Sequence, residues 1–237
     1  MSVAEKIIRA KADYDEVYDA GKQAEHDRFW DSFQNNGNRR TYYYTFYAWS
    51  DENFYPKYDI ISTGTAQQMF SLSEIVDLEQ RLIDCGVQLD VLNSTHNGYM
   101  FYGAKTRAVP VIDLSRGKKC DYFFYNCTNL VTVRKIKYAS NGSQDHTNSF
   151  TNCTELEHLI VEGKIGQTYN LQHSSKLTLE SAKSVLSALV NYAGTANELT
   201  YSVYLHDNVW ELLETDGATS PNETMWRDYV AAIGWNT

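Results

Sequence analysis

The chain has 237 residues, of which 43% are hydrophobic and 14% aromatic, so it can bury a core without disulfides or metal ions. Its 21 lysines and arginines against 30 aspartates and glutamates give a net charge of −9, and no basic run exceeds two residues, as in Arg39-Arg40. This argues against a nucleic-acid partner, which requires clustered positive charge. No window approaches the roughly 20 apolar residues of a membrane-spanning helix, and residues 1–30 lack the apolar stretch of an export signal. We therefore expect no membrane partner.

The first 37 residues are expected to form a helix. Ser2 and Glu5 make a capping box, apolar residues then recur at helical spacing, and Asn36-Gly37 ends the pattern. Gly21 interrupts this helix and can divide it in two. Two interpretations stay open: the helix packs on its own domain, or it docks on a partner or a second copy of the chain. We assign residues 1–37 to a docking or oligomerising helix.

Residues 38–62 favour β-structure. The segment Thr41–Trp49 is β-prone throughout and carries aromatic residues on both faces. We expect a β-rich N-terminal cap that covers the open end of a repeat structure, because terminal repeats differ from internal ones. The alternative is an exposed aromatic platform for a sugar or a protein.

An internal repeat marks residues 63–173 as a solenoid. Phe124–Leu130 returns as Phe150–Leu156, with five of seven positions identical and an offset of 26 residues. Less regular copies begin at Phe70 and Phe101. The pattern predicts strands at 109–114, 131–136 and 159–162, which is typical of leucine-rich-repeat solenoids with short parallel strands and an irregular or helical convex side. We further expect a helix over 78–84 ending at Gly86, a strand at 89–92 and a turn-rich loop at 139–145.

The repeat also predicts the core. Cys127 and Cys153 hold equivalent positions, so we interpret them as stacked, buried thiols with no metal or disulfide role, since the chain's four cysteines form no C-x-x-C pair. The predicted core of the repeat consists of Phe124, Cys127, Leu130, Val133, Phe150, Cys153, Leu156 and Leu159.

Residues 174–237 are expected to form an α/β C-terminal cap, largely helical. A helix capped by Thr178 should run to Gly194, followed by a strand at 199–205 and a short helix capped by Asp207 or Asn208. The run Ser220-Pro221-Asn222-Glu223 predicts the start of a last helix that ends at Gly234. Its expected buried face consists of Met225, Trp226, Tyr229, Val230 and Ile233.

Recognisable catalytic chemistry is absent from the sequence. It contains no nucleophile elbow, phosphate-binding loop, dinucleotide fingerprint or zinc motif, and six single histidines are scattered along it. A site dispersed in sequence stays an alternative. We predict no catalytic residue, no metal ligand and no cofactor, and we interpret Asn126 and Asn152, although they head glycosylation-type triplets, as turn residues.

The two units Phe124–Leu130 and Phe150–Leu156 resemble the BspA-type leucine-rich repeat. Residues 177–181 and 234–237 resemble the cap that follows such repeats in proteins of gut bacteria, their prophages and phages, and residues 18–25 and 29–31 resemble the segment before them. The resemblance implies a right-handed solenoid whose relatives bind or build and do not catalyse.

The resemblance and the expected lack of an export signal favour a non-enzymatic phage virion component from the tail, baseplate or head-fibre region, assembled in the cytoplasm of a bacterial host. Its expected partners are other virion proteins or a host-surface protein or glycan, with homo-oligomerisation through residues 1–36 as a further hypothesis. The alternative is a bacterial surface adhesin or protein-interaction module. An enzyme is the third interpretation.

Overall fold

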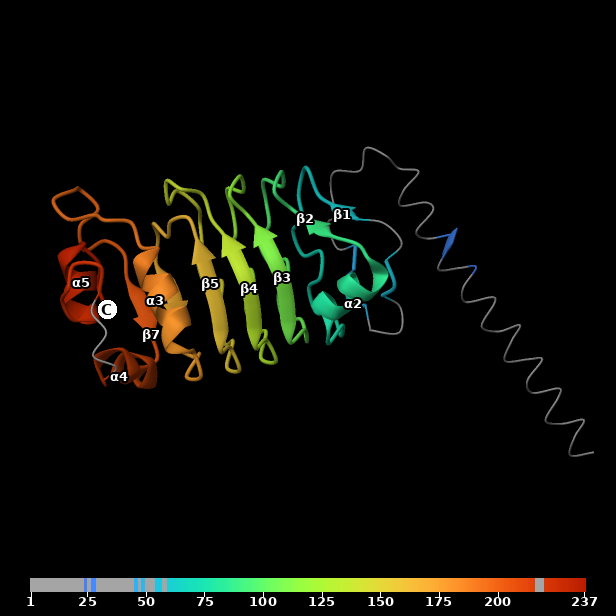
Figure 1. Ribbon diagram of the computed structural model, residues 1–237. Helices are drawn as coiled ribbons and strands as arrows, with labels where there is room; N and C mark the ends of the chain where they lie inside the picture. Colours follow the sequence, from blue (N-terminus) through green and yellow to red (C-terminus); the bar gives the residue numbers. More distant parts are fainter. Residues whose placement is uncertain are drawn as a thin grey trace, which may run out of the picture.

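The computed structural model describes residues 24, 27, 28, 45, 46, 48, 49, 54–56, 59–215 and 220–237. Most of the expected N-terminal helix at 1–37 and most of the β-rich cap at 38–62 lie outside the described residues. The described part is a parallel-strand solenoid of about four turns, with four helices (Figure 1). The expectation of a repeat solenoid built from strands and helices is confirmed at this level.

The described strands of the solenoid are parallel and form three separate sheets. The central sheet has the order β3-β4-β5, and β1-β2 and β6-β7 form two smaller parallel pairs. The predicted strands at 109–114, 131–136 and 159–162 are confirmed to within one residue, whereas the expected strand at 89–92 covers two residues only. The bounds are β1 (Ile60–Ile61), β2 (Leu89–Asp90), β3 (Ala108–Asp113), β4 (Thr132–Lys137), β5 (His158–Glu162), β6 (Tyr169–Leu171) and β7 (Val203–Leu205).

The sequence repeat places equivalent apolar residues in register across the sheet. Val133 pairs with Val109 on one side and with Leu159 on the other, and all three side chains are fully buried. β-Branched and aliphatic residues favour such positions because they pack well on a half-buried strand surface. Ile112 and Ile136 form a second buried row. The pairing register of β4 with β5 shifts between Val133 and Ile136.

Helices close both edges of the central sheet (Figure 1). Helix α2 (Leu78–Cys85) ends at Gly86, whose φ of 65° is the left-handed conformation expected of a C-terminal glycine. Helix α3 (Leu179–Ser187) is capped, as predicted, by Thr178, whose hydroxyl accepts a hydrogen bond from the Ser181 N–H.

Two serine hydroxyls of α3 accept hydrogen bonds from backbone N–H groups at the outer edge of β5. The Ser181 hydroxyl accepts the Leu159 N–H at 2.9 Å, and the Ser184 hydroxyl accepts the Val161 N–H at 2.8 Å. An exposed strand edge is a template for pairing with another chain. Helix α3 therefore ends the sheet without adding a strand.

Two boundaries in the C-terminal cap differ from the prediction. Helix α3 stops at Ser187, well short of Gly194, because Leu189 instead forms a parallel bridge with Ile165. The expected strand at 199–205 shrinks to β7, because Leu199 has a φ of 55° and exposes 57% of its surface.

Helix α4 (Asp207–Thr215) lies where the sequence indicated, but neither predicted cap is used. The His206 Nδ1 atom accepts the Asn208 N–H at 3.2 Å, and the His206 carbonyl accepts the Val209 N–H. His206 therefore satisfies the donors at the start of the helix.

The predicted helix start at 220–223 is wrong. The Ser220 hydroxyl donates to Asn222 Oδ1 within a turn, and Glu223 has a left-handed φ of 64° that no helix tolerates. Helix α5 (Trp226–Ala232) begins only after Met225, which is 46% exposed and so does not belong to the buried face. Gly234, with a φ of 83°, follows the helix as expected.

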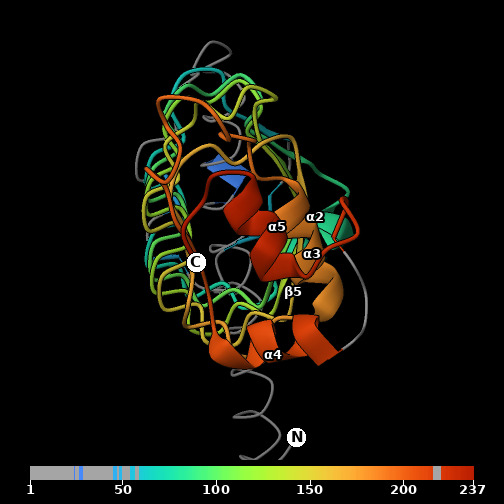
Figure 2. The ribbon, with the colours of Figure 1, turned by 90° about the vertical axis from the view of Figure 1, so that its left-hand side faces the viewer.

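The wall across the core from the sheet consists of stacked irregular turns, which Figure 2 shows as parallel arcs away from the helices. Two positions in each turn adopt left-handed φ angles. The residues that occupy them are Gln68, Tyr99, Tyr122 and Asn148 at the first position, and Leu72, Gly103, Asn126 and Asn152 at the second. The interpretation of Asn126 and Asn152 as turn residues is confirmed, since asparagine tolerates this conformation better than most side chains.

Candidate binding surface

An aromatic stack forms the centre of the repeat. Successive ring centroids of its five phenylalanines lie 5.0, 5.3, 5.1 and 5.2 Å apart, which places one ring in each layer. The structure places all eight predicted core residues of the repeat in this interior, each at most 1% exposed. The stacked rings are Phe46, Phe70, Phe101, Phe124 and Phe150.

The repeat cysteines lie beside this stack as free thiols. Cys127 Sγ donates to the Phe101 carbonyl at 2.8 Å, and Cys153 Sγ donates to the Phe124 carbonyl at 3.1 Å. Burial raises the pKa of Cys127 to about 12 and that of Cys153 well above its usual value. Both therefore stay protonated, and a protonated buried thiol is a poor nucleophile and a poor metal ligand.

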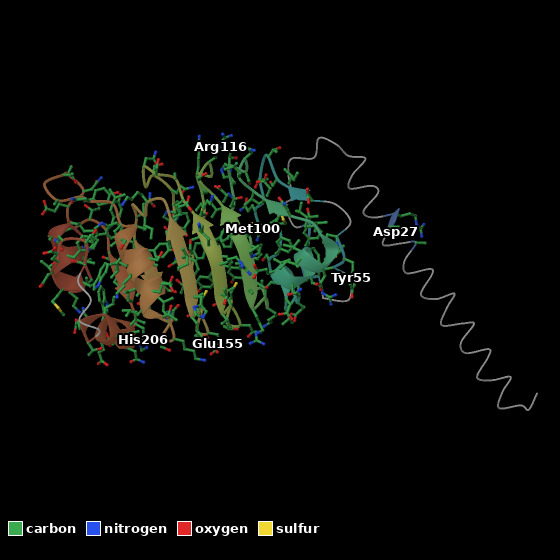
Figure 3. The ribbon with its side chains drawn as sticks, viewed as in Figure 1. Asp27, Tyr55, Met100, Arg116, Glu155 and His206 are labelled. Carbon is green, nitrogen blue, oxygen red and sulfur yellow. The ribbon has the colours of Figure 1, made fainter. Side chains whose placement is uncertain are left out.

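The outer face of the sheet carries balanced charges. Lys135 lies 3.1 Å from Glu162, and Lys137 lies between Asp113 at 3.9 Å and Glu162 at 3.8 Å. Exposed pairs of this kind contribute at most about 1 kcal/mol each. The two rims of the solenoid are also polar, with Arg116 at one rim and Glu155 at the other (Figure 3). These surfaces are those of a solvated scaffold.

The wall of stacked turns carries a different surface, a cluster of four half-buried tyrosines that we call the tyrosine block. Tyr99 stacks on Tyr122 with ring centroids 4.8 Å apart and planes 9° apart, and Tyr102 stacks on Tyr125 at 5.3 Å and 5°. Within a turn, Tyr99 contacts Tyr102 and Tyr122 contacts Tyr125, at 5.7 and 5.3 Å. Together the rings form a two-by-two array.

The tyrosine block is held in strained backbone. Tyr99 and Tyr122 have φ angles of 58° and 53°, a region that a bulky side chain rarely adopts. The equivalent residue of the next turn is Asn148, a type that suits this conformation. Because the same left-handed position recurs in every turn, it belongs to the fold of the repeat, and a strained residue persists there only where its surroundings fix it. Here ring stacking between turns supplies the compensating contacts.

Polar side chains continue the wall beyond the block, and we call Asn126, Asn148, Thr151 and Asn152 the polar shelf. The Asn152 Nδ2 group donates to Asn126 Oδ1 at 2.7 Å, and Thr151 Oγ1 donates to Asn148 Oδ1 at 3.4 Å. All four residues are half-buried. Their amides and hydroxyls thus lie fixed beside the rings of the tyrosine block.

A carboxylate borders the block on its other flank. Asp121 leans over Gly98, where an added Cβ would lie 2.5 Å from its Oδ1 atom. Partial burial and the nearby Asp145 raise the pKa of Asp121, although its own backbone N–H and Lys119 oppose the shift. Burial, followed by Tyr122 and Asp121, raises the pKa of Tyr99, so its hydroxyl is a hydrogen-bond donor at neutral pH.

The five histidines that the structure describes do not form a metal-binding group. In residues 59–215, 220–237 and the few earlier positions described, no group of three or more His, Cys, Asp or Glu side chains could hold a metal ion. His146 is fully buried, and its two ring nitrogens have no hydrogen-bond partner among the residues that the structure describes. Burial lowers its pKa to about 4. A cleft of about 520 Å³ opens between the loop at Asn141 and helix α5, lined in part by Lys164, Asn191 and Tyr229.

Reasoning from sequence missed the tyrosine block. The signal was present, since Tyr99-Met100-Phe101-Tyr102 returns 23 residues later as Tyr122-Phe123-Phe124-Tyr125. The repeat units were aligned on their buried phenylalanine and cysteine positions, and the tyrosines beside these positions were not compared. Aligning the flanking positions would have placed the tyrosines on one outward surface.

Comparison with known proteins adds no relative. No protein family, curated protein or solved structure matches the chain. Among the described helices, none is long and apolar enough to span a membrane.

Proposed function

We propose that this chain is a non-enzymatic binding protein that presents the outer wall of its solenoid to a partner. The tyrosine block carries the proposal: four half-buried aromatic rings stack in pairs at the surface of the wall. Tyrosine supplies a large contact area together with a polar group, and it is enriched where proteins bind partners.

The scaffold beneath the block suits a binding role. Each turn is fixed to the next by backbone hydrogen bonds, such as Tyr99 N–H to the Asp121 carbonyl and Tyr122 N–H to the Thr147 carbonyl, both within 2.9 Å. A rigid scaffold lowers the entropy lost when a partner binds. The repeat core offers no reactive group, since its thiols are protonated and buried.

The resemblance in the repeat units supports a BspA-type leucine-rich-repeat protein, and with it a virion component of a phage, from the tail, baseplate or head-fibre region. In this role the wall contacts other virion proteins or a receptor on the host surface. The same surface also favours a second candidate, a bacterial adhesin or interaction module, because a solenoid wall with exposed aromatic rings serves either setting.

Fractionation of the native host tests this proposal. After phage induction, intact particles are banded on a density gradient, and the chain is quantified by mass spectrometry in the particle, envelope and free fractions. We expect it in the particle band at a fixed ratio to the capsid protein. Recovery with the envelope supports the adhesin, whereas a chain found only in the free fractions, alone and monomeric, contradicts both.

A further inference from the structure

The tyrosine block ends abruptly on its C-terminal side. Tyr122 and Tyr125 each stack on a ring of the preceding turn, and the positions that follow them are Asn148 and Thr151. In the part of the chain that the structure describes, no ring stacks on the other face of either tyrosine. Because the stacked planes are nearly parallel and repeat from turn to turn, these two free faces look along the solenoid axis, over the polar shelf.

The opposite end of the block differs in chemistry. Gln68 and Ser71 precede Tyr99 and Tyr102 there, as Asn148 and Thr151 follow Tyr122 and Tyr125 at the C-terminal end. Beside them Leu72 holds the second left-handed position, and a Cβ at Gly103 would meet Leu72 Cδ2 at 2.6 Å. An apolar side chain therefore borders the N-terminal end, whereas the amides of the polar shelf border the rings of Tyr122 and Tyr125 at the C-terminal end.

The polar shelf supplies hydrogen-bonding groups at the level of those rings. Asn152 and Asn126 bond to each other through one donor and one acceptor, so the Asn126 amide nitrogen and the Asn152 amide oxygen take no part in that bond. An asparagine amide offers two donors and an acceptor, and a threonine hydroxyl offers a donor and an acceptor. The shelf can thus both donate and accept hydrogen bonds beside an aromatic face.

We propose that the rings of Tyr122 and Tyr125 and the polar shelf bind a neutral saccharide, with one sugar ring lying on the tyrosine faces. One face of a sugar ring presents C–H groups that fit the negative face of an aromatic ring, while its rim presents hydroxyls that both donate and accept hydrogen bonds. The inference rests on the proposed binding function and names its ligand class.

Charge and shape select this ligand over others. Asp121 beside the block and the net charge of −9 disfavour sialylated or sulfated glycans and nucleic acid. A proline-rich peptide docks in grooves lined by aromatic residues, whereas here the rings are bordered by amides and hydroxyls. A site with aromatic faces and fixed polar groups in both hydrogen-bonding roles is what a neutral sugar requires.

The repeat itself suggests the test variant. Tyr122→Asn with Tyr125→Thr gives this turn the residues of the next one, Asn148 and Thr151, and asparagine relieves the strained φ at position 122. The fold should therefore persist. Tyr204→Ala removes an exposed tyrosine from β7 and serves as the control.

The full-length protein is screened on immobilised oligosaccharides of glucose, galactose and N-acetylglucosamine, and on sialylated and sulfated oligosaccharides, and the best binder is titrated by calorimetry. We expect a neutral oligosaccharide to bind the wild type and the control equally, and the double variant about tenfold or more weakly at unchanged melting temperature.

Several results would overturn the inference: no neutral oligosaccharide bound, a preference for anionic glycans, or equal affinity in the double variant. Binding of a proline-rich peptide in place of sugars, or self-association lost in the double variant, would overturn it too by showing another occupant of the site. If the wild type binds no sugar but bands with phage particles, only the saccharide assignment fails. If it binds sugar but stays in the free fractions, the proposed virion role fails instead.

Discussion

His146 should make the protein sensitive to acid. It is fully buried beside Tyr138 and Tyr169, with ring centroids 4.1 and 5.9 Å away, and in the described part of the chain neither ring nitrogen has a hydrogen-bond partner. Burial lowers its pKa from about 6.5 to about 4, against the opposing charge of Asp145. The folded protein therefore resists protonation at a site that the unfolded chain protonates readily.

The direction of the effect follows from this difference. Above pH 6.5 both states hold a neutral His146, so its contribution is fully present, and it is lost as the pH falls from about 6.5 to about 4. Linkage gives a loss of about 2–3 kcal/mol in the free energy of unfolding between pH 7.5 and 4.5. His146→Cys, the residue found at the equivalent position 120, removes the titrating group.

Urea unfolding of both proteins at pH 7.5 and 4.5 measures the effect. The carboxylates titrate in both, so their contributions cancel in the comparison. We expect the loss of stability on acidification to be about 2–3 kcal/mol smaller in the variant. Equal losses in the two proteins would show that His146 is hydrated or partnered in solution, and would refute the reasoning.

Four further predictions concern the scaffold and its N-terminal segment. Cys153→Asp should abolish folding, because an unpaired carboxylate in the core exceeds the stability margin of about 5–15 kcal/mol, while Cys153→Ala should stay folded; circular dichroism distinguishes them, and a folded aspartate variant would contradict the packing described. Ser181→Ala combined with Ser184→Ala leaves two N–H groups of β5 without their acceptors and should lower the free energy of unfolding by about 1–3 kcal/mol for each. A chain ending near Gly166 should aggregate, as light scattering would report. Removing residues 1–36 should keep the fold but abolish assembly; if the shortened chain unfolds and the full-length protein is a monomer by sedimentation, the docking hypothesis is wrong.

The repeat could be recognised in the sequence because each layer of the solenoid needs the same residue types at the same positions. Phe124 and Phe150 had to stack, and Cys127 and Cys153 had to fill the same narrow space, so identical residues mark identical positions. The helix ends at Gly86 and Thr178 could also be predicted, because helix capping depends on local backbone geometry. These elements were therefore predicted correctly.

The errors arose where a local signal competed with other contacts. Ser220 looked like a helix cap, but its hydroxyl bonds to Asn222, and the left-handed Glu223 delays helix α5 until Trp226. The tyrosine block escaped notice for another reason. Its rings meet only when two turns stack, so no single stretch of sequence contains the surface.

The central claim is that the wall bearing the tyrosine block makes the functional contact. A photo-crosslinking amino acid in place of Tyr125, introduced in the native host, tests it directly, with the same substitution at His158 on the sheet face as the control. We expect crosslinks to a partner or glycan from position 125 and none from position 158. Crosslinks from position 158 alone, with none from 125, would place the contact on the sheet face and contradict the account.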